Sequence, residues 1–295
     1  MRSGARYLGP ITSGIASYPT RESSAADTSG ICAIGVRASG FRSSAGNRFL
    51  ALSLLVRTWN VFHGNAFPPR RHGYLREMIE LVCHDRPDVV CLQEIPVWGV
   101  SRLERWSSMQ VFPVVSRGPR VPRRIGTPVT RLNQGFFRSA FVGQANAVLV
   151  ASSLEAEDRG HTCISDAGRE RRVVQVVRIA HALVVANLHA NGGSEVARLE
   201  IERARTFAES VADSDDVVVV AGDFNLSDIS LPGYSEPVNG IDHVLVRGAP
   251  SFPPVVWPRE RRMHGKVVLS DHAPVEVTIE TTSVTRFGRA TPKEI

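Results

Sequence analysis

Apolar runs bounded by polar or turn-forming residues divide the chain from about residue 49 onward into strands and helices. Continuous apolar runs of roughly four to eight residues are typical of strands that are buried on both faces. We expect strands in the segments FLALSLLVRTWN (49–60), DVVCLQE (88–94), NAVLVAS (146–152), RRVVQVVRIA (171–180), HALVVANLHA (181–190), VVVVAG (217–222), IDHVLVRG (241–248) and APVEVTIE (273–280). Strand pairs that follow closely in sequence, mixed with helices, predict sheet packed on sheet with helices outside.

Two segments have the spacing of amphipathic helices. Residues 71–85 carry apolar side chains at i, i+3, i+4 and i+7, namely Leu75, Met78, Ile79 and Val82, and Arg86 and Pro87 are expected to end this helix. A second helix is expected to have Ser194 as its N-cap and Glu195 in its first turn. Its apolar stripe consists of Ala197, Ile201, Ala204, Ala208 and Val211.

The first part of the chain has a different composition. Residues 1–48 are rich in Ser, Gly, Ala and Arg without a sustained period, so they cannot bury enough apolar surface to offset the entropy of ordering. We interpret them as a disordered tail or an over-long gene start, residues 49–282 as the folded domain, and residues 283–295 as a flexible C-terminal tail. No apolar run reaches the length of a membrane span.

Charge and cysteine content limit the possible functions. The net charge is +6, but residues 1–56 hold six arginines against Glu22 and Asp27, which leaves 29 basic and 27 acidic residues in the remainder. Global charge is therefore weak support for a nucleic-acid partner. The cysteines Cys32, Cys83, Cys91 and Cys163 show no paired zinc-type spacing. We expect a reducing, cytoplasmic location and no zinc.

Polar side chains follow several of the predicted strands. Asp223 and Asn225 follow the valine run 217–220 and, two residues apart in an extended chain, would project from the same face. Comparable groups at or near the ends of other strands are Asn60, Gln93, Glu94, His189, Asn191, Asp242, Asp271 and His272. Each has a simple structural explanation, such as a turn or a cap. Because strand ends on one rim of a sheet converge, the set indicates one shared site for a metal, a water or a phosphate.

Taken in order, the motifs TWNV, LQE, NLH, GDFN, IDHV and SDHAPV resemble those of the endonuclease/exonuclease/phosphatase superfamily, the deoxyribonuclease I-like fold, over about residues 50–281. The resemblance implies an α+β fold, a four-layer α/β sandwich with two packed, mostly antiparallel β-sheets flanked by helices. It also implies a divalent-metal site and hydrolysis of phosphate esters. Oxygen ligands suit Mg²⁺ or Mn²⁺. We expect a monomer.

The resemblance assigns the metal ligands residue by residue. Glu94 would be the principal ligand, with Asn60 and Asp271 completing or orienting its shell. Asp223 and Asn225 would face the attacking water and the phosphate and, in some members of the superfamily, would also contact a second metal.

The imidazoles have roles by the same resemblance. His189 would donate a hydrogen bond to the phosphate or assist the leaving group. His272 would be a general base or a phosphate contact, and Asp242 would fix its tautomer. Asp223 and His272 remain alternatives for the general base. Since Asp271 and His272 are adjacent in a predicted strand, we expect them to point to opposite sides.

The substrate has three possible classes. A nuclease that cleaves phosphodiester bonds in DNA or RNA is favoured. The alternatives are a phosphatase or phosphodiesterase on a small or lipid-linked phosphate, such as an inositol phosphate, and a catalytically silent protein that binds phosphate or nucleic acid. The first motif continues as Val61, Phe62, His63, Gly64 and Asn65, which departs from the asparagine-rich run of abasic-site endonucleases and argues against a role in DNA repair.

An arginine-rich segment bears on the same choice. Residues 105–154 contain seven arginines and no acid between Glu104 and Glu155. The segment is either a mobile loop that grips a polyanion or an irregular, solvated surface loop. Candidate substrate contacts are Asn191, Arg120, Arg123, Arg124 and, in the basic segment 252–266, Trp257.

Overall fold

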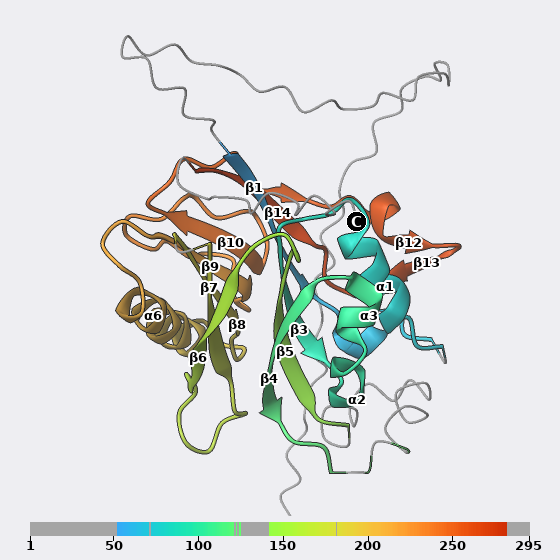
Figure 1. Cartoon of the computed structure of the whole chain (residues 1–295). Helices are drawn as coiled ribbons and strands as arrows, with labels where there is room; N and C mark the ends of the chain where they lie inside the picture. Colours follow the sequence, from blue (N-terminus) through green and yellow to red (C-terminus); the bar gives the residue numbers. More distant parts are fainter. Residues whose placement is uncertain are drawn as a thin grey trace, which may run out of the picture. The chain divides into compact units, whose positions relative to one another are not determined.

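The computed structural model describes residues 52–281, except residues 71, 121, 123, 125–141 and 181. In this part of the chain two β-sheets lie face to face (Figure 1). The first sheet has the order β11 (Val255–Val256), β14 (Val275–Thr281), β1 (Leu52–Asn60), β3 (Val89–Ile95), β5 (Gln144–Val150) and β4 (Gln110–Arg117). The second has the order β10 (Asp242–Arg247), β9 (Val217–Asp223), β8 (Leu183–His189), β7 (Val173–Ile179) and β6 (Ala156–Cys163).

Strand pairing is mostly antiparallel, and parallel pairing occurs between β1 and β3 and between β8 and β9. A small third sheet joins β12 (Met263–His264), β13 (Val267–Leu269) and β2 (Ala66–Phe67). Short 3₁₀ helices follow β1 and precede β12, namely η1 (Phe62–Gly64) and η3 (Arg259–Arg262).

Helices cover the outer faces of both sheets. The first sheet is covered by α1 (Leu75–Cys83), α2 (Val97–Val100) and α3 (Leu103–Ser107), and the second by α6 (Ser194–Ser210) (Figure 1). The order helix, sheet, sheet, helix confirms the expected α+β sandwich. Among the described residues no helix is both long and apolar enough to cross a membrane.

The two longer helices bury the predicted stripes. Leu75, Met78, Ile79 and Val82 of α1 pack on the outer face of the first sheet, and Ala197, Ile201, Ala204 and Ala208 of α6 pack on the second. The expected cap is wrong, because Ser194 is the first helical residue and Gly193, at φ +100°, occupies the N-cap position without a side-chain bond. Val211 follows the helix as its C-cap.

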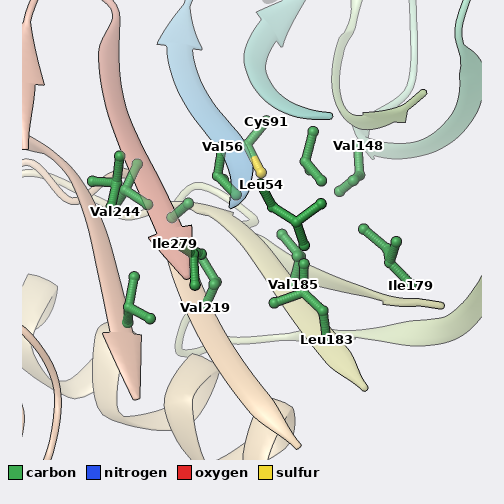
Figure 2. Packing of buried hydrophobic residues seen from close by; sticks show 14 of the residues in the cluster. Leu54, Val56, Cys91, Val148, Ile179, Leu183, Val185, Val219, Val244 and Ile279 are labelled. Carbon is green, nitrogen blue, oxygen red and sulfur yellow. The ribbon is translucent and has the colours of Figure 1, made fainter. Parts of the chain in front are cut away.

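The space between the sheets changes from apolar to polar along the strands. One end is filled by the buried cluster in Figure 2, which includes Leu54, Val56, Val185, Val219 and Val244. Because side chains alternate between faces, each strand continues the same inner face at every second residue. On β1 that face passes from Leu54 and Val56 to Thr58 and Asn60, on β8 from Val185 to Asn187 and His189, and on β9 from Val219 to Asp223. The polar end is therefore built by several strands at once.

Amide side chains connect the sheets at this polar end. Gln93 Nε2 donates to Asn187 Oδ1 at 2.8 Å and to Thr58 Oγ1 at 3.0 Å. Asn187 Nδ2 donates to the carbonyl of Ala147 at 3.0 Å and to that of Leu92 at 3.1 Å. These buried bonds hold the sheets in register next to the residues that carry chemistry.

The segment 105–154 is not a loop throughout, because it contains the end of α3 and the strands β4 and β5. β4 is an edge strand with alternating exposure, and Pro113 interrupts its pattern, so the sequence pattern did not predict this strand. Arg120 and Arg124 are exposed, whereas Arg123 lies outside the described residues.

Candidate active site

The candidate site lies at the polar end of the interface between the sheets. Side chains that reach it come from both sheets, from η1 and from the turn after β13, and they are Asn60, His63, Glu94, His189, Asp223, Asp242, Asp271 and His272. All except Glu94, Asp271 and His272 are buried. Asn60 and His272, which are 212 positions apart in the chain, are thereby brought to one end of the sandwich. Asp223 connects them, because its Oδ2 accepts from Asn60 Nδ2 at 2.9 Å and lies 3.8 Å from His272 Nε2.

Asp223 is the centre of the site. Its Oδ2 atom accepts a hydrogen bond from Asn60 Nδ2 at 2.9 Å and lies 3.3 Å from His189 Nε2 and 3.8 Å from His272 Nε2. Its Oδ1 atom accepts the backbone N–H of Asn225 at 3.0 Å. Each oxygen is thus oriented by a donor, so the carboxylate has a fixed direction.

Gly222 allows β9 to carry Asp223 this close to β8. Its φ of +147° is rare for residues with a side chain, and a Cβ atom there would lie 1.9 Å from the carbonyl oxygen of Leu188. Asn225 also has positive φ, +48°, and its Nδ2 donates to the carbonyl of Ala190 at 2.9 Å. Glycine and asparagine in the GDFN motif therefore serve the turn and fix the carboxylate between them.

Glu94 faces two imidazoles. It lies in a bulge of β3, at φ +56°, and not at the end of the strand as expected. Its Oε2 is 3.4 Å from His63 Nε2 and its Oε1 is 4.0 Å from His189 Nε2. Burial and, next, the charge of Asp223 raise the pKa of Glu94 to about 7.

The hydrogen bonds of His189 define its tautomer. Its Nδ1 lies 3.0 Å from a guanidinium nitrogen of Arg172 and 3.2 Å from Gln144 Nε2, and both of these groups are donors. Nδ1 therefore accepts, and the proton is on Nε2, which faces Asp223. Burial, followed by the charge of Arg172, lowers the pKa of His189 well below its usual value, so the ring is neutral.

Asp242 and His272 form a tight pair. Asp242 Oδ2 accepts from His272 Nδ1 at 2.8 Å. Burial alone would lower the pKa of His272, but the bond to Asp242 and the charges of Asp242, Asp223 and Asp271 raise it to about 10. The imidazole is therefore a cation at neutral pH. The expected contact between these two residues is present in the structure.

Asp271 and His272 do not begin a strand. They lie in the turn between β13 and β14, after Ser270 at φ +60°, so the argument from extended geometry fails for them. Arg262 holds this turn, because one of its guanidinium nitrogens donates to the carbonyls of Leu269, Ser270 and His272. Asp271 is exposed, and its charge contributes to the raised pKa values of Glu94 and His272.

Two expected substrate contacts are used inside the protein. Trp257 is 3% exposed, its Nε1 donates to Glu276 at 2.8 Å, and the guanidinium of Arg261 lies 3.6 Å from its ring centroid. Its indole is therefore not free to stack on a base. The backbone N–H and Nδ2 of Asn191 donate to Glu200, and its Oδ1 accepts from Arg172.

The sequence did not reveal His63, Gln144, Arg172 or Glu200 as parts of the site. One signal for Glu200 was present, since it is a buried acid on the apolar face of α6, between Ala197 and Ile201. An acid at such a position needs a buried partner, and here that partner is Asn191.

A two-sheet sandwich with carboxylates and imidazoles gathered at one end of the sheet interface is the architecture of deoxyribonuclease I-like proteins. The profile of the Endonuclease/Exonuclease/phosphatase family matches residues 58–272, and the chain belongs to this family. A comparison with curated proteins gave no match.

Solved structures support the same fold. The chain is similar to an endonuclease/exonuclease/phosphatase from Beutenbergia cavernae, with a TM-score of 0.56 and 16% identity over 77% of this chain and 71% of that chain. It is also similar to truncated TDP2 from Caenorhabditis elegans, with a TM-score of 0.53 and 15% identity over 78% of this chain and 98% of that chain. A conserved protein of unknown function from Enterococcus faecalis gives a TM-score of 0.56 and 13% identity over 77% of this chain and 99% of that chain.

Proposed function

We propose that the chain is a divalent-metal-dependent phosphoesterase that cleaves phosphodiester bonds, with nucleic acid as its substrate class. The observation that carries the proposal is the arrangement around Asp223, whose Oδ2 lies 2.9 Å from Asn60 Nδ2, 3.3 Å from His189 Nε2 and 3.8 Å from His272 Nε2. An acceptor for a water proton and two imidazole donors for phosphate oxygens are thereby fixed within one small volume.

The residues fit a divalent cation. Glu94 is a carboxylate whose pKa is raised first by burial and next by the charge of Asp223. A cation would relieve this repulsion. Glu94 is the proposed principal ligand, with Asn60 and Asp271 completing or orienting its shell. A bound Mg²⁺ or Mn²⁺ would polarise a phosphate oxygen and offset its charge.

Among the described residues, a group of acidic and imidazole ligand atoms that lie within 4.8 Å of one another is found on Asp223, Asp242 and His272. Because Asp242 and His272 already bond to each other, we assign this group to the phosphate and the water. The protonated, positively charged imidazole of His272 would stabilise charge that develops on the phosphoryl oxygens, and Asp242 would hold the ring in place.

These assignments favour Asp223 over His272 as the group that orients and deprotonates the attacking water. A histidine with a pKa of about 10 carries its proton at neutral pH and is a poor base there. His189, neutral with its proton on Nε2, would donate to a phosphate oxygen or to the leaving oxygen. Asn225, through its backbone N–H, keeps Asp223 aimed at the water.

A small phosphate ester is the second candidate substrate, and a cavity favours it. A cavity of about 250 Å³ adjoins His272, Asp242 and Asp271, and the rest of its lining includes Val238, Asn239, Ile241, Val256 and Val275. Its size and its apolar wall beside the acids fit one small group attached to the phosphate better than a duplex.

Activity assays distinguish the substrate classes. We expect hydrolysis with Mg²⁺ or Mn²⁺, none with EDTA, and preference for DNA, RNA or bis-p-nitrophenyl phosphate over p-nitrophenyl phosphate and inositol phosphates. Glu94→Gln should lose about a hundredfold or more of the activity, whereas Glu80→Gln, at an exposed pair with Arg76, should change nothing. Full activity in EDTA would contradict the proposal. Binding of DNA without hydrolysis of any ester would identify a silent binding protein.

Arg120 and Arg124 test the nucleic-acid substrate directly. Their joint replacement by alanine should raise KM for DNA. The slope of its salt dependence should fall by an amount that corresponds to about two fewer released counterions, while kcat for the small diester stays unchanged. Arg198 and Arg203 on the exposed face of α6 provide the matched control pair. If the double variant cleaves DNA with the same salt slope as the wild type, the two arginines do not contact the substrate.

A further inference from the structure

His63 faces the proposed metal ligand Glu94, although it is not one of the residues assigned to the metal above. It is buried, with 6% of its surface exposed, in the turn after β1, and its Nε2 faces Glu94 Oε2 at 3.4 Å. A charge-assisted hydrogen bond between these groups would be about 2.7–2.9 Å long. The Asp242–His272 pair, at 2.8 Å, shows what such a bond looks like in this protein. His63 and Glu94 therefore face each other at a greater distance than a tight bond requires.

The separation is that of two ligands of one ion. Donor atoms that each lie about 2.1 Å from a metal are about 3.0–3.4 Å apart when the angle at the metal is between a right angle and a tetrahedral angle. The 3.4 Å between His63 Nε2 and Glu94 Oε2 is in this range. The side chain of His63 is 7% exposed and that of Glu94 is 19% exposed, so an ion between them would be largely shielded from solvent.

The backbone supports a functional role for this turn. Phe62 and His63 are consecutive residues with positive φ, +44° and +51°, and Glu94 has φ +56°. Such conformations are unfavourable for non-glycine residues and cluster at functional sites. The turn is tied to the site, because Asn60 Oδ1 accepts from the Phe62 backbone N–H while Asn60 Nδ2 donates to Asp223. The protein thus holds both members of the facing pair in strained conformations.

His189 is a poor nitrogen ligand in this arrangement. Its Nδ1 accepts from Arg172 and Gln144, so its Nε2 carries a proton and has no lone pair for a metal. His272 donates through Nδ1 to Asp242, and its Nε2 faces Asp223 and not Glu94. Of the three imidazoles, His63 is therefore the one whose nitrogen lies nearest to the proposed principal ligand.

We propose that His63 Nε2 is a nitrogen ligand of the cation that Glu94 binds, so that the site selects a first-row transition ion over Mg²⁺. Imidazole is a ligand for transition ions, whereas Mg²⁺ prefers oxygen ligands and retains water. The inference rests on the proposed function for the presence of a cation, but it specifies the metal class and adds a ligand outside the motifs.

Pulsed electron paramagnetic resonance of the full chain loaded with Mn²⁺ alone tests the proposal without any assay of activity. We expect a nitrogen hyperfine coupling that changes when histidine is isotopically labelled and that disappears in His63→Asn. Asparagine is chosen because it tolerates positive φ. The matched control is His72→Asn, since His72 and Glu77 form a similar but exposed pair at 3.7 Å, and it should leave the coupling unchanged.

Metal affinities provide the second readout. We expect Mn²⁺ to bind the wild type at least about tenfold more tightly than Mg²⁺ in calorimetry, and His63→Asn to weaken Mn²⁺ about tenfold or more with a change below about threefold for Mg²⁺. His63→Asp, which replaces nitrogen by oxygen at a residue that also tolerates positive φ, should shift the preference toward Mg²⁺.

A spectrum of the wild type without nitrogen coupling would overturn the proposal, and this result needs no variant to fold. So would a coupling that persists in His63→Asn and is lost in His272→Asn. These outcomes are separate from the proposed function: a protein that hydrolyses no ester would contradict the function, while the nitrogen coupling would still report on His63.

Discussion

His272 donates from Nδ1 to Asp242 Oδ2 across 2.8 Å, while its Nε2 lies 3.8 Å from Asp223 Oδ2. One ring therefore connects a buried carboxylate that holds it to the carboxylate at the centre of the site. Asp242 lies at the start of β10 and pairs with Asp223 of β9 in the sheet register. The distance between the two acids is thus set by the sheet, and one nitrogen of His272 faces each of them.

Asp242→Asn should reduce turnover while leaving the metal in place. The amide keeps the size of the side chain but removes the charge that stabilises the imidazolium, so kcat should fall on the order of a hundredfold or more. Asp271→Asn should behave in the opposite way, with weaker metal binding that high Mg²⁺ or Mn²⁺ partly rescues. Titration of the metal for both variants is the measurement. If metal rescues Asp242→Asn and not Asp271→Asn, the two roles are reversed.

The raised pKa of His272 predicts a pH dependence of stability. The folded protein holds this proton up to about pH 10, whereas the unfolded chain releases it near 6.5, so the contribution is complete below pH 6.5 and is lost as the pH rises toward 10. In EDTA, the melting temperature of the wild type should fall over this window more steeply than that of His272→Asn. Parallel curves would show that the ring gains no proton affinity on folding.

Glu94 predicts a pH dependence of metal binding. Burial and the charge of Asp223 raise its pKa to about 7, so a cation must displace a proton below that pH. The apparent affinity for Mn²⁺, measured by calorimetry, should rise about tenfold per pH unit up to pH 7 and then level off. An affinity that is constant between pH 5.5 and 8 would show that the ligand carboxylate is already ionised.

Much of this site could be predicted from the chain alone. The inner strands β3, β8 and β9 are continuous apolar runs, and the polar residues that follow them on the same face reach the site because side-chain alternation carries them there. Strand β6 could not be predicted in this way. Its sequence AEDRGHTC is mostly polar, and it is a strand because it pairs with the exposed edge of β7.

The missing members of the site share a physical cause. Arg172 reaches His189 from the residue before β7, and Gln144 reaches it from the opposite sheet, so no local spacing relates them. His63 faces Glu94 because the consecutive residues Phe62 and His63 adopt left-handed backbone angles, which could not be predicted from the sequence VFHGN. Trp257 suggested a binding surface, but it is buried and donates to Glu276, which also accepts hydrogen bonds from Arg57 and Arg261.

Gly222→Ala should separate the strands that carry the site. A Cβ atom at this position would meet the carbonyl oxygen of Leu188 at 1.9 Å, so β8 and β9 must move apart next to the pair of His189 and Asp223. We expect a loss of about 3 kcal/mol or more in the free energy of unfolding. Gly240→Ala is the matched control, because Gly240 has nearly the same φ, +151°, with nothing within 4 Å, and should cost about 1–2 kcal/mol. Equal losses in chemical denaturation would mean that backbone strain, and not the clash, decides.

Arg172 should act on catalysis through His189. Its guanidinium lies 3.0 Å from His189 Nδ1 and, with Gln144, keeps the ring proton on Nε2, where the phosphate is expected. Arg172→Met removes the donor, and with Gln144 alone the ring can rotate or change tautomer. We expect kcat to fall by about ten- to a hundredfold with KM little changed, because a donor to the transition state is misplaced.

The neighbour Arg171 supplies the control for this prediction. It donates to the backbone carbonyls of Val115 and Ser116 and does not contact His189, so Arg171→Met should keep kcat within about twofold. Nitrogen NMR of the His189 ring distinguishes position from structure. The wild type should show a protonated Nε2 and an unprotonated Nδ1, and Arg172→Met should show a mixture of tautomers at an unchanged melting temperature. A single tautomer in Arg172→Met together with full kcat would limit Arg172 to holding Asn191 in place.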